Sequence, residues 1–560
     1  MKPLSDYPRP QLQRDSYICL NGEWEYAITK DTAIPRHFDG KIIVPFSPET
    51  HLSGVNRMVH PDEWLFYKTK LKFPKDFIKD KVFLHFGAVD QIAEVFINDI
   101  YVGRHVGGFL PFSFEIKKFI KKDESNTLVV RVKDVTDTSY YSRGKQRIKR
   151  GNIWYSPQSG IYMPVWMESV SKDYIQEIKL NPDIARESIN ITVKTDAPSI
   201  QCELEGAVIK LVPNKENRIR LKNTRFWSPE HPNLYNFTLK TKGDTVQSYF
   251  AMREITTKMD EQGHSRIYLN GQPYFMKGVL DQGYYLDGFL TPTTDDDYIK
   301  DITLVKELGF NTIRKHIKIE SLRWYYHCDR LGMLVWQDFV NGGTKYNPLT
   351  ISLPLVFGAY YKDNKYGMLG RKDPMGRLEA EAEFKDTIKL LYNCPCIVLW
   401  TIFNEAWGQF DAKRIYNELK EIDSTRLYDH ASGWIDQRVS ETKSLHVYFK
   451  RFKMPGKWAT KKRAVILSEC GGYALKIDHH TFNNTNFGYK KLKSREELEN
   501  EYEKFINLDI KPNIEKGLCA FIYTQLSDVE DELNGFITYD RRVVKVNKNK
   551  IKNINKEVKY

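Results

Sequence analysis

The hydrophobic pattern along the chain changes its period near Arg253. Before this residue, short runs rich in β-branched and aromatic residues alternate with polar positions and end at turn residues, which indicates β-strands. Residues 1–170 are therefore expected to form an all-β sandwich, with a tight hairpin turn at Asn98 and Asp99. Its strands are expected at residues 42–46, 81–89, 93–103 and 126–135.

Residues 171–256 carry a second set of short strands, which includes INITVKT, IQCELEG and YNFTLKT. About 85 residues with strands at this spacing are typical of an immunoglobulin-like β-sandwich.

Beyond residue 256, strand-length apolar runs alternate with amphipathic segments of helical period. This order predicts parallel strands joined by crossover helices. Eight such strands over about 300 residues fit a (β/α)8 TIM barrel, which we assign to residues 257–560. Little helical sequence separates the fifth strand from the sixth. The strands are expected at residues 273–279, 310–316, 333–339, 396–404, 426–432, 444–449, 463–469 and 518–525, and the helices at 295–309, 321–332, 378–393, 411–423 and 495–508.

The composition limits the class of protein. A chain of 560 residues with 41% hydrophobic residues is typical of a globular protein of several domains. The net charge of +13 brings a nucleic-acid partner into question, but the basic residues are spread along the chain, with their densest run at residues 544–560. We find no zinc-finger spacing and no RNA-binding motif, so a solvated basic surface without a nucleic-acid partner is the preferred interpretation. Aromatic residues, at 13%, fit sugar stacking and large β-rich cores equally well.

The cysteines and the N-terminal segment predict where the protein works. The seven cysteines have no regular spacing, and Cys394-Pro395-Cys396 is not a CxxC motif, so neither a zinc site nor a redox motif is predicted. The first residues carry no apolar signal segment, and no window approaches about 20 apolar residues. These observations predict a cytoplasmic protein with no membrane partner.

Polar residues end several of the predicted barrel strands. In TIM barrels the active site forms at the carboxyl ends of the strands. One glutamate at such an end could equally be structural, for example as an ion-pair partner of Arg314. Two glutamates that converge with cationic, amide and phenol side chains favour a catalytic site. The converging residues are Arg314, His316, Asp338, Asn404, Glu405, His446, Tyr448 and Glu469.

Paired carboxylates suit glycoside hydrolysis, in which one protonates the leaving oxygen and the other attacks the sugar. Glu405 fits the acid/base, because its apolar strand and Trp407 would raise its pKa. Glu469 fits the nucleophile, which must stay ionised beside Arg314 or Tyr448. Asn404 can then hydrogen-bond the 2-hydroxyl of the sugar.

The sequence resembles glycoside hydrolase family 2 over nearly its whole length. The resemblance implies an N-terminal sugar-binding jelly-roll sandwich, an immunoglobulin-like sandwich and a TIM barrel. It also implies retention of anomeric configuration, with the glutamate of the Asn-Glu pair, Glu405, as acid/base and that of strand seven, Glu469, as nucleophile. The segments that carry it include LNGEWEY (20–26), IWYSPQSGIYMPVW (153–166), FWSPEHPNLY (226–235), IYLNGQPYFMKGV (267–279), WTIFNEAWGQFD (400–411) and VILSECGG (465–472).

Some motifs of this sequence differ from those of the family's subgroups, and these differences indicate which sugar the protein would cleave. β-Glucuronidases of the family carry an Asn-x-Lys motif that grips the sugar carboxylate, whereas this chain has Glu532-Leu533-Asn534 there. A retaining exo-β-galactosidase is therefore the first hypothesis. β-Glucuronidase, galacturonidase, mannosidase and arabinosidase remain alternatives, as does a catalytically silent carbohydrate-binding protein. No metal or cofactor is expected, because WQDFVNGG (336–343) does not match the magnesium ligands of large β-galactosidases; assembly into a homo-oligomer stays open.

Secondary substrate contacts are expected from the rim. Hydrogen bonds to sugar hydroxyls are expected from His316, Asp338 and His446. By the family resemblance, Asp134 of the first sandwich would reach over the barrel mouth. For each aromatic candidate a place in the core is an equal alternative. The candidate stacking residues are Trp336, Trp407, Tyr448 and Tyr523.

Overall fold

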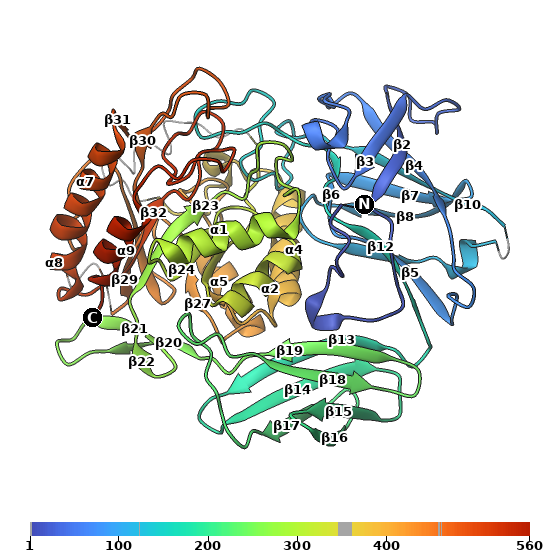
Figure 1. The fold of residues 1–560 in the computed structure, drawn as a ribbon, viewed down its shortest axis with the longest axis horizontal. Coiled ribbons are helices and arrows are strands. Elements are labelled where there is room, and N and C mark those ends of the chain that lie inside the picture. The colour runs from blue at the N-terminus through green and yellow to red at the C-terminus, as the bar shows by residue number, and fades with distance from the viewer. Residues whose placement is uncertain (1–2, 122–123, 345–360, 457–459, 461) are drawn as a thin grey trace.

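Three groups of elements follow one another along the chain and lie against each other in Figure 1. The computed structural model describes every residue except 1–2, 122–123, 345–360, 457–459 and 461. The first sandwich (blue) flanks the barrel, and the second sandwich (teal to green) lies beneath both. Among the described residues, no helix is both long and apolar enough to cross a membrane.

The first sandwich packs a six-stranded sheet, in the order β3-β2-β4-β10-β7-β8, against a four-stranded sheet, β1-β12-β5-β9. The predicted hairpin turn between β7 and β8 is confirmed, because Asn98 and Asp99 both adopt positive φ, at 52° and 65°. The strands are β1 (Tyr17–Cys19), β2 (Gly22–Thr29), β3 (Gly40–Val44), β4 (Trp64–Leu71), β5 (Lys81–Phe86), β6 (Val89–Asp90), β7 (Ile92–Ile97), β8 (Ile100–Val106), β9 (Phe112–Glu115), β10 (Asn126–Lys133), β11 (Gly160–Ile161) and β12 (Val165–Val170).

The second sandwich has a three-stranded sheet, β13-β14-β17, facing a four-stranded sheet, β16-β15-β18-β19. A three-stranded antiparallel sheet, β20-β21-β22, follows it and leads into the barrel. The strands are β13 (Ile175–Asp183), β14 (Ser188–Thr195), β15 (Ile200–Leu204), β16 (Ala207–Leu211), β17 (Glu216–Arg220), β18 (Tyr235–Lys240), β19 (Thr245–Phe250), β20 (Ile255–Met259), β21 (Ser265–Leu269) and β22 (Gln272–Pro273).

The barrel has the eight parallel strands that the sequence predicts, hydrogen-bonded in the order β27-β26-β25-β24-β23-β32-β29-β28. The ring of ladders has one seam, between β27 and β28, where Thr442 Oγ1 donates to the Tyr428 carbonyl at 3.0 Å. Residues 430–441 contain no helix, so this connection departs from the β/α alternation. The strands are β23 (Met276–Asp281), β24 (Thr312–Lys315), β25 (Leu334–Asp338), β26 (Ile397–Thr401), β27 (Leu427–Asp429), β28 (Thr442–Val447), β29 (Ala464–Gly471) and β32 (Leu518–Thr524).

Helix boundaries follow local capping. Thr294 and Asp297 form a capping box at the start of α1. Asp373 accepts from Met375 N and Gly376 N, so α4 begins four residues before the predicted start. The described α-helices are α1 (Asp295–Glu307), α2 (Leu322–Leu331), α4 (Pro374–Leu391), α5 (Ala412–Ile422), α7 (Arg495–Phe505), α8 (Lys511–Ile514) and α9 (Lys548–Lys556).

Helix α9 lies in the basic C-terminal run, where the sequence analysis predicted only a solvated surface. Ile551 and Ile554 are buried, and Asn555 Nδ2 donates to the Leu308 carbonyl at the end of α1 at 2.8 Å. The lysines of α9 lie on the side of the helix that faces solvent.

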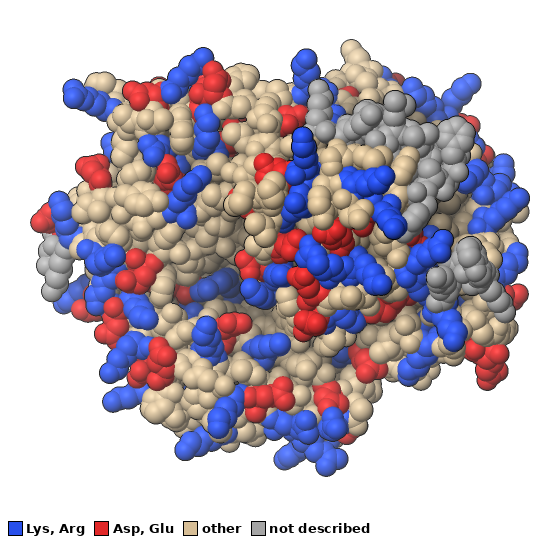
Figure 2. All heavy atoms as spheres, turned by 180° about the vertical axis from the view of Figure 1, so that it is seen from behind, with Lys and Arg blue, Asp and Glu red and all other residues tan. Residues whose placement is uncertain are grey.

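The charged side chains are mixed on the face of the molecule in Figure 2. Lys and Arg alternate there with Asp and Glu and do not form one stripe.

A buried ion cluster ties the N-terminal segment to both sandwiches. Glu168 of β12 accepts from Tyr7 Oη at 2.7 Å and from Arg14 Nη1 at 3.2 Å. The same Arg14 donates through Nη2 to Asp244, next to β19, at 3.0 Å. Burial acts to raise the pKa of Glu168, but the charges of Arg9 and Arg14 outweigh it and hold that pKa at about 2.

Replacing Glu168 tests this cluster. Glu168→Gln leaves a buried guanidinium underpaired, so the free energy of unfolding is expected to fall by about 3–5 kcal/mol. Because the pKa is depressed in the folded state, the ion pair stabilises fully above the ordinary value of 4.5, and this contribution is lost as pH falls toward 2. Urea midpoints at pH 7, 5 and 3 measure both effects. Glu25→Gln, which removes an exposed ion pair with Lys68, should leave the midpoints unchanged; equal midpoints for both variants would contradict the assignment.

Candidate active site

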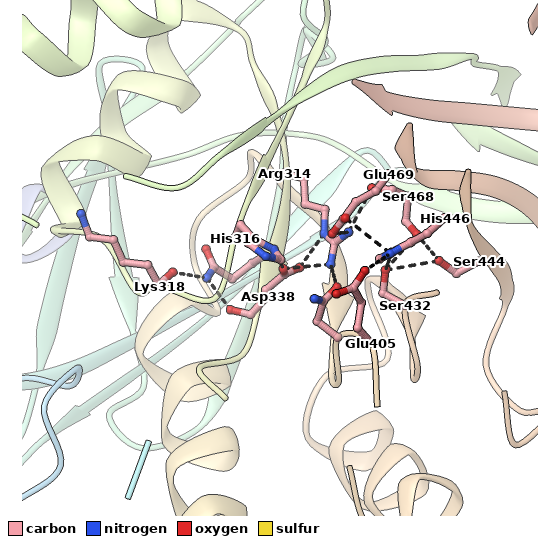
Figure 3. A network of polar contacts seen from close by, with 12 residues as sticks. Arg314, His316, Lys318, Asp338, Glu405, Ser432, Ser444, His446, Ser468 and Glu469 are labelled. Atoms are coloured by element: carbon pink, nitrogen blue, oxygen red, sulfur yellow. Dashed lines mark hydrogen bonds and ion pairs between the residues drawn. The ribbon is translucent and has the colours of Figure 1, made fainter. Parts of the chain in front are cut away.

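The eight polar residues predicted at strand ends lie together on one rim of the barrel, as Figure 3 shows for most of them. They come from five strands or from the segments that follow them, so the parallel sheet brings together positions that are far apart in sequence. The eight are Arg314 in β24, His316 directly after it, Asp338 at the end of β25, Asn404 and Glu405 after β26, His446 in β28, Tyr448 directly after it, and Glu469 in β29.

Arg314 is the centre of this network. Its guanidinium donates through Nε and Nη2 to the two Asp338 oxygens, both at 3.0 Å. It also donates to Asn404 Oδ1 at 2.8 Å and to Glu469 Oε1 at 3.1 Å. The Arg314 side chain is fully buried, so these carboxylates compensate its desolvation and are fixed by it in return.

Asp338 links Arg314 to His316. His316 Nδ1 lies 2.8 Å from Asp338 Oδ2. Burial lowers the pKa of His316, so its imidazole is predominantly neutral at pH 7. Asp338 was expected to bind a sugar hydroxyl, but both its oxygens are engaged by Arg314 and His316. Its position therefore suits the orientation of these two side chains.

The two glutamates meet at His446. Its Nδ1 lies 2.9 Å from Glu405 Oε1 and 3.4 Å from Glu469 Oε2. One oxygen of each glutamate and this nitrogen all lie within 4.8 Å of one another. On the far side of the ring, His446 Nε2 lies 2.9 Å from Ser432 Oγ. Ser432 donates in turn to Ser468 Oγ at 2.8 Å, which fixes the imidazole across the barrel seam.

Glu469 is strongly stabilised as a carboxylate. Burial acts to raise its pKa, but the imidazole of His446, the guanidinium of Arg314 and a hydrogen bond from Tyr448 Oη outweigh it. Together they hold the pKa of Glu469 at about 2. Its side chain is only 6% exposed.

Glu405 sits in a different environment. The strand was expected to run into Asn404, but β26 ends at Thr401, and Glu405 lies in a turn with φ of 51°. Its amide donates to the Ser432 carbonyl at 2.9 Å, which holds the turn against the segment after β27. The Glu405 side chain is 23% exposed, so of the two glutamates it lies nearer to solvent.

Several residues near this site were not predicted from the sequence. The ring of Tyr489 stacks on Tyr448 with centroids 3.8 Å apart, and Trp434 meets His446 edge-on at 5.5 Å. Both lie in irregular segments without a strand-end pattern, so no periodicity pointed to them. For Ser432 a signal existed, because it closes the fifth predicted strand.

The family models match three successive parts of the chain. Residues 39–160 match the galactose-binding domain-like model of glycosyl hydrolase family 2, residues 174–253 the model described as glycosyl hydrolases family 2, and residues 262–514 its TIM barrel domain. The chain belongs to glycoside hydrolase family 2. The expected architecture of two sandwiches and a barrel is confirmed.

Known relatives within the family carry different names. A β-galactosidase of Thermoanaerobacter pseudethanolicus is 25% identical over 386 residues, which cover 64% of this chain and 46% of that relative. The fold resembles a β-D-glucuronidase of Dictyoglomus thermophilum (TM-score 0.77, 18% identity, 99% of each chain). It also resembles a β-galacturonidase of Eisenbergiella tayi bound to galacturonate (TM-score 0.72, 18% identity, 99% of this chain and 100% of that one).

Four of the predicted contact residues do not face the rim network. Trp336 and Tyr523 are fully buried in the barrel core, where Trp336 Nε1 meets Met276 Sδ at 3.1 Å and Tyr523 stacks on Phe536. Strand alternation could not separate these inward core positions from rim positions.

The other two residues, Trp407 and Asp134, make contacts away from the rim network. Trp407 is 4% exposed and packs edge-on against Trp154 of the first sandwich, at 5.0 Å. Asp134 is 2% exposed and accepts from Thr136 N at 2.6 Å and Ser159 Oγ at 2.9 Å, so it stays inside its sandwich.

The site could also be considered as a metal centre, because Glu405, His446 and Glu469 present donor atoms close together. A cation there would lie beside the Arg314 guanidinium, which already donates to Glu469. This charge arrangement favours proton transfer over ion binding.

Removing one hydroxyl tests the electrostatics of Glu469. Tyr448→Phe deletes a charge-assisted hydrogen bond and is expected to raise the pKa of Glu469, so that the acidic limb of the kcat/KM profile moves to higher pH. A hydrogen bond to a charged group is worth about 1.5–3 kcal/mol, which corresponds to a loss of about 10- to 150-fold in kcat/KM. Profiles measured from pH 3 to 8 on an aryl glycoside check this. Tyr473→Phe is the matched control, and an unmoved acidic limb in Tyr448→Phe would contradict the role.

Proposed function

We propose that the enzyme is a retaining exo-β-glycosidase in which Glu469 is the nucleophile and Glu405 the acid/base. The observation that carries this proposal is the short separation of their carboxyl oxygens, within 4.8 Å. Retaining enzymes place the two carboxyl groups about 5–5.5 Å apart, whereas inverting enzymes leave room for a water at about 6.5–9.5 Å.

The first step forms a covalent intermediate. Glu469, which is kept ionised, attacks C1 of the sugar, while the bond from C1 to the leaving oxygen breaks and Glu405 gives that oxygen a proton. In the second step Glu405 takes a proton from water, the water oxygen bonds to C1, and Glu469 leaves as a carboxylate. His446 contacts both glutamates, which places it to stabilise the charge as it moves between them.

Asn404 is oriented for the 2-hydroxyl of the sugar. Because its Oδ1 accepts from Arg314, the amide nitrogen is turned the other way and can donate. Such a hydrogen bond strengthens toward the transition state of glycoside cleavage.

For the sugar itself we propose galactose. Glu532 is 2% exposed and accepts from Asn534 Nδ2 at 3.3 Å and from Tyr155 Oη of the first sandwich. Burial raises the pKa of Glu532, and the negative charge of Glu469 adds to this rise. A sugar carboxylate beside them would be repelled, whereas hydroxyl groups could donate to Glu532.

A uronic acid is the second candidate, supported by one observation. The ammonium of Lys145, in a loop of the first sandwich, opposes the rise in the pKa of Glu532 and adds to the lowering of the pKa of His316 by burial. Lys145 is therefore close enough to the site to attract an acidic sugar.

Conservative changes of the two glutamates test the mechanism. Glu405→Gln should lower kcat/KM about 10²- to 10⁴-fold for poor leaving groups, with less loss for dinitrophenyl glycosides that need no protonation. Azide should restore turnover in a Glu405→Gly variant and yield the β-glycosyl azide. Glu469→Gln should lose turnover with both kinds of leaving group. Proton NMR of the first product anomer reads the stereochemistry, and an α-anomer released from a β-glycoside would refute retention.

A panel of nitrophenyl glycosides tests the sugar. The β-galactoside is expected to give a higher kcat/KM than the β-galacturonide and β-glucuronide, because a uronate would lie near Glu532. Glu532→Gln removes that charge, so the ratio of kcat/KM for the β-galactoside to kcat/KM for each uronide should fall by about tenfold or more. Glu530→Gln, a neighbouring buried carboxylate that accepts from Ser156 N, is the control. If the wild-type enzyme prefers a uronide, and Lys145→Met loses this preference, the second candidate is established instead.

A further inference from the structure

Phe449 is exposed to an unusual degree for a large apolar side chain. It is 74% exposed, more than any other large hydrophobic residue in the described part of the chain. It follows directly after Tyr448, at the end of β28. An exposed aromatic ring beside a catalytic site commonly marks a contact surface for a ligand.

Three aromatic rings lead from the carboxylates to this position. Tyr448 donates its hydroxyl to Glu469. Tyr489 stacks on Tyr448 at an interplanar angle of 10°, and Phe449 meets Tyr489 edge-on with centroids 5.4 Å apart. The series therefore runs from a buried carboxylate to solvent.

The middle ring is held rigidly. The Tyr489 amide donates to the Gly472 carbonyl at 3.0 Å, next to the short parallel pair of β30 (Tyr473–Leu475) and β31 (Lys490–Leu492). A Cβ on Gly472 would meet Tyr489 Cδ2 at 2.3 Å, so the close approach of the ring needs glycine there. A rigid ring stacks on a ligand with little loss of conformational entropy.

The position of the rings relative to the two glutamates indicates which part of the substrate they meet. Glu405 is more exposed than Glu469, at 23% against 6%, so the leaving group, which Glu405 protonates, points outward. Tyr489 contacts the exposed Phe449, so the series of rings also extends outward, toward the leaving-group side.

We propose that Phe449 and Tyr489 form the subsite for the leaving group, where a flat, apolar ring face of the aglycone packs against them. This inference rests on the proposed function. A six-membered sugar with axial C–H groups and an aromatic ring both present such a face.

The test uses Phe449→Ala with three substrates that share one glycone. A β-linked disaccharide and a phenyl glycoside carry a ring as leaving group, whereas the glycosyl fluoride carries none. kcat/KM is expected to fall about 3- to 10-fold for the ring-bearing substrates and to stay unchanged for the fluoride. A loss confined to the disaccharide identifies a sugar ring as the occupant, and a loss confined to the phenyl glycoside identifies an aromatic one.

Control variants separate this subsite from a structural role. Phe449→Trp should restore kcat/KM, and Tyr101→Ala, which removes an aromatic side chain that is 51% exposed in the first sandwich, should have no effect. An equal loss on all three substrates, or no loss on any, overturns the subsite while leaving the hydrolase intact. No hydrolysis of the fluoride by the wild-type protein overturns the proposed function itself.

Discussion

The buried guanidinium of Arg314 is the interaction on which the candidate site depends. It touches Asp338, Asn404 and Glu469, which belong to three other strand ends. Removal of an unpaired arginine from water would cost several kcal/mol, and removal of the carboxylates alone would cost as much. Each group is therefore tolerable only in the presence of the others, and the barrel must bring four strand ends into register to satisfy them. The same constraint keeps Glu469 ionised, so the stability of the rim and the charge of this carboxylate have one origin.

Much of the fold could be predicted because its periodicity is strong. The eight barrel strands and the capped helices α1 and α2 lie close to their expected positions, since apolar runs and capping residues are local signals. Helix α9 was missed because lysines and asparagines dilute its apolar positions, and burial of Ile551 depends on contacts that no local pattern encodes. The lack of helical sequence between the fifth and sixth predicted strands already indicated an irregular connection at the seam between β27 and β28.

The candidate site could be predicted only in part, for a related reason. Polar residues that interrupt apolar strands revealed Arg314, Asn404, His446 and Glu469, because such interruptions are costly in a buried sheet. Aromatic residues gave no such signal: Trp336 and Tyr523 share the composition of binding platforms but lie in the core. Tyr489 reaches Tyr448 from an irregular segment, where only tertiary contacts define its place.

The barrel seam has a mechanical consequence. Going one way round the barrel, Glu405 is connected to Glu469 through Arg314 and an unbroken series of strand ladders. Going the other way, the connection crosses the seam by side-chain hydrogen bonds between Ser432, His446 and Ser468. The separation of the Glu405 and Glu469 carboxyl groups is thus set by backbone ladders along one arc and by side-chain hydrogen bonds across the seam on the other. A change within residues 430–441 would therefore alter only the side-chain link across the seam and leave the backbone ladders of the other arc intact.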